Sequence, residues 1–121
     1  MSGQRDFWLV RLASAVEADL DQILQWTAEH FGEEQADSYA ETLMAAVDAL
    51  KAGPTTAGVK ARSDLPEGIL TLYAARLGRK ARHVILFRAE RERGRKTIQV
   101  LRILHDAMDF PRHLADEEAD H

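Results

Sequence analysis

Four side chains that can ligate a metal ion or move a proton lie within nine residues near the end of the chain: His105, Asp106, Asp109 and His113. A metal site needs ligands that converge on one point, usually with others drawn from elsewhere in the fold. The alternative is structural, with Asp106 capping a short turn and Asp109 paired with a nearby arginine. We favour the structural interpretation, and we expect neither a metal ion nor another cofactor.

A second group consists of basic side chains around three predicted strands. Its members are Arg76, Arg79, Lys80, Arg82, His83, Arg88 and Arg102. Successive side chains of a strand point to opposite faces, so Arg82 and Arg88 share one face and His83 lies on the other. Such a surface can bind phosphate or an acidic partner, or it can be a set of solvated strand ends. For Arg76, Arg82 and Arg102 we expect a functional or structurally paired role.

Two histidines of this region, His83 and His105, could act as general acid and base near neutral pH. RNA cleavage by attack of the 2′-hydroxyl needs a base, a proton donor and a cation on the phosphorane, which His105 and arginines could supply. The alternative is a hydrogen-bonded or partly buried histidine at a strand end, and we favour it. The sequence contains no Gly-rich phosphate loop, nucleophile elbow or zinc-finger spacing.

We expect the aromatic side chains of Trp8, Trp26 and Tyr39 to lie in a core or an interface rather than to stack on nucleic acid bases. Trp26 lies off the main apolar stripe of its predicted helix, so we expect it to be half-exposed. An exposed tryptophan on a small domain often marks a partner site.

The elements that must position these residues follow from the apolar spacing. Residues 7–12 predict a strand, and residues 14–31 predict a helix with a capping box of Ser14 and Glu17 and an end at Gly32. A second helix is predicted to end at Gly53, and residues 53–68 form a loop. Strands are predicted over 69–77, 81–89 and 97–104, with a charged turn at 90–96 and a short helix or turn at 106–110. This order predicts an α+β fold of two layers, β-α-α-β-β-β, with a helical hairpin on a mainly antiparallel sheet.

Composition limits the function classes further. The chain has 121 residues, no cysteine and a net charge of -4, which fits one domain and excludes disulfides and thiol chemistry. The charge is -7 over residues 1–51, +8 over 52–104 and -5 over 105–121. We expect a single domain over residues 1–114 and a flexible acidic tail over 115–121. No apolar run is long enough to span a membrane, and no secretion signal is visible, so we expect a cytoplasmic protein.

Several short motifs, in this order and spacing, resemble the RelE/ParE-type toxins of bacterial type II toxin–antitoxin systems. The resemblance covers about residues 7–114 and is carried by Ala15-x-x-Ala18-Asp19-Leu20-Asp21-x-Ile23-x-x-Trp26, Phe31-Gly32-x-x-x-Ala36-x-x-Tyr39, Leu50-x-x-Gly53-Pro54, Arg62-x-Asp64-Leu65-x-x-Gly68-Ile69, Gly78-Arg79-Lys80-Ala81-Arg82-His83 and Arg102-Ile103-Leu104-His105-Asp106-Ala107-Met108-Asp109. The tract Leu104-His105-x-x-Met108-Asp109 resembles the ParE-like, plasmid-stabilisation branch.

This resemblance implies two possible activities. ParE-like members inhibit growth by binding DNA gyrase and trapping the gyrase–DNA complex, without chemistry of their own. RelE-like members are ribosome-dependent mRNA endonucleases, commonly with a tyrosine or histidine after the last strand; here that position offers His105 and no tyrosine. We favour the ParE-like activity, with a ribonuclease that uses His105 and the sheet arginines as the alternative.

The resemblance also implies a cognate antitoxin, typically a ribbon-helix-helix protein whose C-terminal segment folds on the toxin in a hetero-oligomer. A basic sheet would attract an acidic antitoxin segment and accelerate its association. We expect the antitoxin or target contacts among Arg76, Arg82, His83, Arg102, His105, Asp106, Met108, Asp109 and Trp26.

Overall fold

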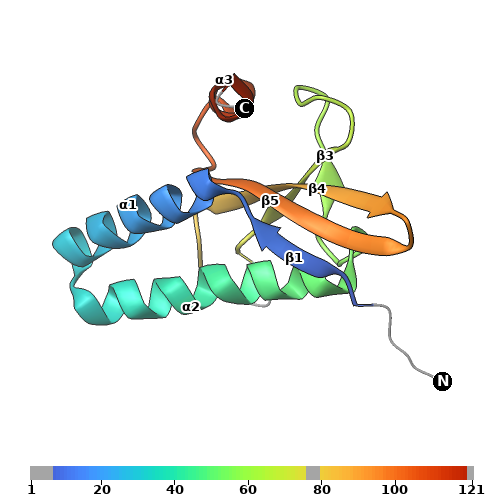
Figure 1. Ribbon diagram of the computed structural model, residues 1–121. Helices are drawn as coiled ribbons and strands as arrows, with labels where there is room; N and C mark the ends of the chain where they lie inside the picture. The colour runs from blue at the N-terminus through green and yellow to red at the C-terminus, as the bar shows by residue number, and fades with distance from the viewer. Residues whose placement is uncertain (1–6, 76–79, 120–121) are drawn as a thin grey trace.

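The computed structural model describes residues 7–75 and 80–119. Its elements are, in order, β1 (Leu9–Leu12), α1 (Ser14–Phe31), α2 (Glu33–Ala49), the 3-10 helix η1 (Leu50–Ala52), β2 (Lys60–Ala61), β3 (Ile69–Tyr73), β4 (His83–Glu92), β5 (Arg95–His105) and α3 (Phe110–Ala119). Helices α1 and α2 form the predicted antiparallel hairpin, and Figure 1 shows that its tip projects beyond the sheet.

The five strands form one sheet in the order β1-β5-β4-β3-β2. The last four pair antiparallel, as predicted, whereas β1 pairs with β5 in parallel, with Leu9 opposite Thr97. The hairpin, which follows β1 in the chain, lies across one face of the sheet. The predicted α+β architecture is confirmed, as a mixed sheet with helices on both faces.

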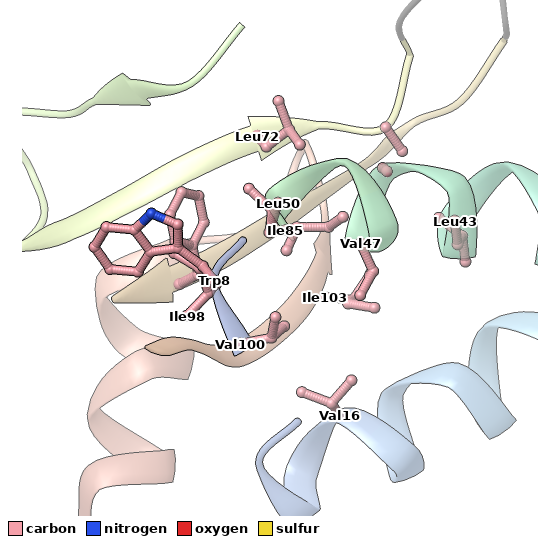
Figure 2. Close-up of a cluster of buried hydrophobic side chains, with 13 residues drawn as sticks. Trp8, Val16, Leu43, Val47, Leu50, Leu72, Ile85, Ile98, Val100 and Ile103 are labelled. Carbon is pink, nitrogen blue, oxygen red and sulfur yellow. The ribbon is translucent and has the colours of Figure 1, made fainter. Parts of the chain in front are cut away.

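Both faces of the sheet are buried. The face under the hairpin packs Val16, Leu43, Val47 and Leu50 against Leu72, Ile85, Phe87, Ile98, Val100 and Ile103, and Figure 2 shows part of this core with Trp8 at its margin. The opposite face packs Ile69, Val84, Leu86, Leu101 and Leu104 against Leu65, Phe110 and Leu114. A strand that is covered on both faces has apolar side chains at successive positions, which explains the unbroken apolar sequence from Val84 to Phe87.

Helix ends differ in part from the prediction. The capping box was wrong, because Ser14 is already helical and the N-cap is Ala13, which makes no side-chain cap bond. The Ala13 N–H instead donates to the Val100 carbonyl oxygen at 2.9 Å and so ties the start of α1 to β5. The predicted stop at Gly32 is confirmed by a φ of 98°, which favours glycine.

The β-hairpin of β4 and β5 is longer than the sequence indicated. The expected charged turn at 90–96 is mostly strand, and the reversal occupies only Arg93 and Gly94, with φ values of 52° and 80°. A two-residue turn with positive φ at both central residues matches the twist of antiparallel strands. The two-residue strand β2 was not predicted; it lies inside the expected loop.

The C-terminal helix is also longer than expected. Residues 106–108 form a turn, and α3 starts at Phe110 and continues to Ala119, through part of the segment that we expected to be a flexible tail. Phe110 and Leu114, one turn apart, are its buried contacts with the sheet. The domain boundary at residue 114 stays a prediction.

Candidate functional site

Polar and aromatic side chains gather where β4 begins and β5 ends, next to helix α2. His83 and His105 are register partners on these two strands, and their rings meet edge to face with centroids 5.4 Å apart. Tyr39 reaches this point from α2, since its ring centroid lies 5.6 Å from that of His83. The strand register and the helical hairpin therefore bring together residues 66 positions apart in the chain.

His83 is held as a neutral ring. The Arg82 backbone N–H donates to the Tyr39 hydroxyl oxygen at 3.1 Å, which leaves the phenolic proton for His83 Nδ1 at 2.7 Å. Burial, and then the neighbouring His105, lower the pKa of His83 to about 4. Burial also raises the pKa of Tyr39, so the phenol keeps its proton.

This arrangement affects stability at acid pH. The unfolded chain takes up a proton on this histidine near pH 6.5, and the folded chain only near pH 4. Between these values the unfolded state binds more protons, so stability is lost as the pH falls through this window and is fully present above it.

Arg82 is exposed yet paired. Its guanidinium makes two hydrogen bonds to Asp106, from Nε at 3.0 Å and from Nη2 at 3.1 Å, although 70% of its side chain is accessible. The bonds from Arg82 lower the pKa of the Asp106 carboxyl. The cation and the carboxylate therefore present a nearly neutral pair beside His105.

Arg102 is paired inside the fold. It donates two hydrogen bonds to Asp19 of α1, from Nε at 2.9 Å and Nη2 at 2.7 Å, and a third from Nη1 to the His113 carbonyl oxygen of α3 at 3.0 Å. Only 16% of the Arg102 side chain and 7% of the Asp19 side chain are exposed. A β-bulge at Leu101 resets the strand alternation here, and bulges commonly redirect a neighbouring side chain.

Comparison with known proteins places this chain in a family. A sequence profile for the ParE toxin of the type II toxin–antitoxin system parDE matches residues 10–110. The chain belongs to the ParE toxin family. Toxin ParE1 of Mycobacterium tuberculosis, in strain CDC 1551 / Oshkosh and in strain H37Rv, is 31% identical over 103 residues, which cover 85% of this chain and 94% of the relative.

The fold also matches a solved structure. A chain from the chromosomal ParDE toxin–antitoxin system of P. aeruginosa superimposes with a TM-score of 0.66 at 23% identity, covering 84% of this chain and 98% of that one. This structural likeness concerns the fold, whereas the family match identifies a ParE toxin of a type II toxin–antitoxin system, which implies a cognate antitoxin.

The residues predicted for the ParE site do not form one cluster. Arg76 lies outside the described residues. Arg82, His83, His105 and Asp106 meet, and the exposed Met108 lies in the turn that follows them. Arg102 belongs to the buried pair with Asp19. Trp26, which is 53% exposed as expected, stacks on His30 near the end of α1.

The structural roles of the two aspartates in ParE are the reverse of those expected. Asp106 makes the ion pair with Arg82, and Asp109 is the cap. Its Oδ1 accepts the Arg112 backbone N–H at 3.3 Å, and its carbonyl oxygen accepts the His113 N–H at 3.2 Å, which places Asp109 at the N-cap of α3. Across residues 7–75 and 80–119, no three histidine or acidic side chains lie close enough to hold a metal ion.

The sequence predicted neither the contact of Tyr39 with His83 nor that of Asp19 with Arg102. Tyr39 fits the apolar stripe of α2, so nothing in its spacing points to His83. Asp19 did carry a signal, because it lies three residues after Val16 and four before Ile23, on the buried face of α1. A lone carboxylate on a buried face implies a buried cation.

Proposed function

We propose that this ParE toxin arrests growth in the cytoplasm by binding DNA gyrase and trapping the gyrase–DNA complex, without chemistry of its own. A cognate antitoxin of the ribbon-helix-helix type neutralises it in a hetero-oligomer. The observation that supports this proposal is the pairing of two arginines of the predicted site: Arg82, just before β4, with Asp106, and Arg102 of β5 with Asp19. Arginines committed to carboxylates are poorly placed to stabilise a phosphorane.

A ribosome-dependent ribonuclease is the second candidate, because two histidines and a tyrosine converge. His105, with 38% of its side chain exposed, would be the base. Two contacts weigh against this role. The Tyr39 hydroxyl occupies His83 Nδ1, and the Arg82 guanidinium, a cation close to His105, is already paired with Asp106. No helix in the part of the chain that the structure describes is long and apolar enough to cross a membrane.

Purified components separate the two candidates. We expect the toxin to inhibit gyrase supercoiling and to leave cleaved DNA complexes, and the His105→Ala variant to do so equally well. The proposal is wrong if supercoiling is unaffected while mRNA is cut only when ribosomes are present, and if His105→Ala abolishes that cleavage.

The antitoxin part of the proposal is tested in cells. Expression of the toxin alone should arrest growth with induction of the DNA-damage response. Co-expression of the neighbouring reading frame should restore growth, and its product should co-purify with the toxin. Arrest that persists in spite of that product would contradict this part of the proposal.

A further inference from the structure

The tip of the helical hairpin carries an aromatic surface that belongs to neither core. Trp26 and Phe31 are 53% and 64% exposed. The Trp26 ring stacks on His30 with centroids 4.0 Å apart, and Phe31 meets the Trp26 ring edge-on at 5.8 Å. Figure 1 shows the end of α1 beyond the sheet, so the strands do not cover it. We call these three residues the aromatic tip.

The aromatic tip is ordered before any partner arrives. His30 Nδ1 lies 2.8 Å from the Trp26 carbonyl oxygen, and since a carbonyl can only accept, Nδ1 carries the proton. Thr27 Oγ1 donates to the Ile23 carbonyl oxygen at 2.7 Å one turn earlier. An exposed, pre-organised tryptophan has little conformational entropy to lose on binding, which is typical of an interface anchor.

The charge around the aromatic tip has one sign. Residues 14–49, which form the whole hairpin, contain nine Asp and Glu and no Lys or Arg. Asp19 is neutralised by Arg102. Glu29, Glu33 and Asp37 instead border a solvent-facing groove between the two helices, beside Trp26 and Phe31 in the chain. This surface repels nucleic acid phosphates and attracts a partner rich in lysine and arginine.

We propose that the aromatic tip is the surface through which the toxin contacts the protein part of its target, at an apolar pocket rimmed by basic residues. This inference rests on the proposed function, since a DNA-handling enzyme such as gyrase has strongly basic surfaces. Charge excludes the other occupants considered: DNA would be repelled, and a symmetric contact between two hairpins would bring carboxylates of both copies together.

The test uses the full chain and purified gyrase, with supercoiling inhibition and direct binding to DNA-free gyrase as readouts. Trp26→Ala/Phe31→Ala should weaken both by at least about tenfold, as loss of an anchor does. Glu29→Gln/Glu33→Gln/Asp37→Asn should slow association at low salt and flatten its salt dependence. Because these side chains are outside the cores, thermal unfolding of each variant should stay close to that of the parent.

Matched controls come from the same chain. Met44→Ala removes an exposed apolar side chain of α2 about three turns from the tip, and Glu90→Gln/Glu92→Gln removes two carboxylates at the far end of β4. Both should behave like the parent in supercoiling and binding.

Three results would overturn the inference while the proposed function stands: full inhibition by Trp26→Ala/Phe31→Ala, an equal loss in Met44→Ala, or a loss of antitoxin binding with gyrase inhibition intact. The last result would assign the tip to the antitoxin. If the parent toxin neither binds nor inhibits gyrase, the proposed function itself fails, and the inference fails with it.

Discussion

Breaking the buried pair of Arg102 and Asp19 from one side should be among the most destabilising single substitutions in this chain. Asp19 accepts three hydrogen bonds, two from Arg102 and one from the Ile103 backbone N–H at 3.0 Å. Replacing Arg102 with methionine keeps much of the side-chain volume but leaves the buried carboxylate with a single donor. Breaking a buried pair from one side costs about 3–5 kcal/mol, a large part of the roughly 5–15 kcal/mol that stabilises a typical domain.

Urea denaturation measures this cost. With a slope of about 2 kcal/mol per M, Arg102→Met should lower the midpoint by about 2 M. The matched control is Arg82→Met, which removes an arginine with the same two-bond geometry to a carboxylate but from an exposed pair. Exposed pairs contribute little because water screens them, so the control should keep its midpoint.

A double-mutant cycle completes the test. Asp19→Asn alone should also be destabilising, because it leaves the Arg102 cation buried without a counter-charge. Asp19→Asn/Arg102→Met should lose less than the sum of the two single variants, because neither charge is then left alone. The reasoning is refuted if Arg102→Met and Arg82→Met shift the midpoint equally, or if the two single losses simply add.

Two further predictions concern other contacts. Lowering the pH from 6.5 to 4 should destabilise the parent more than His83→Asn. A pKa of about 4 in place of 6.5 corresponds to a loss of about 3 kcal/mol in the free energy of unfolding, which we reduce to about 1–2 kcal/mol because water reaches part of the ring. Equal pH dependence of urea midpoints would contradict this. Gly53→Ala should cost about 2–4 kcal/mol, because its φ is +96° and the new Cβ would meet the Trp8 indole, 2.8 Å from Cδ1. Gly68→Ala, with a similar φ but open space around it, should cost less, and equal losses in thermal unfolding would disprove the clash.

Local patterns predicted the fold well where apolar spacing alone shows which faces of an element are buried, one face for α2 and both faces for the middle of β4. The stripe of α2 and the run from Val84 to Phe87 both lie where the spacing indicated. Predictions failed where long-range contacts decide: the start of α1 is fixed by a backbone bond from Ala13 to β5, and no local signal records that bond. The length of α3 escaped because Phe110 and Leu114 alone show its apolar spacing before the acidic residues begin.

The site was predictable in residue type and not in geometry. The sequence indicated that Arg82 and Arg102 have a functional or paired role, and both are paired. It could not indicate that one pair is exposed and the other buried, because the partners lie 24 and 83 positions away. Tyr39 shows the same limit, since a tyrosine on an apolar stripe has the same spacing whether its hydroxyl reaches a histidine or solvent.

The position of the buried pair also bears on how the aromatic tip could work. Asp19 lies seven residues before Trp26, two helical turns away on the same side of α1. Arg102 therefore anchors α1 to β5 close to the point where the hairpin extends past the sheet, and its bond to the His113 carbonyl oxygen extends the anchor to α3. Because α1 is fixed near its start, the aromatic tip at its other end is held in one orientation. The net charge of -4 thus averages an acidic hairpin, free of lysine and arginine, with a basic middle of the chain, and the buried Arg102 adds an ion pair to the apolar core that joins the hairpin to the sheet.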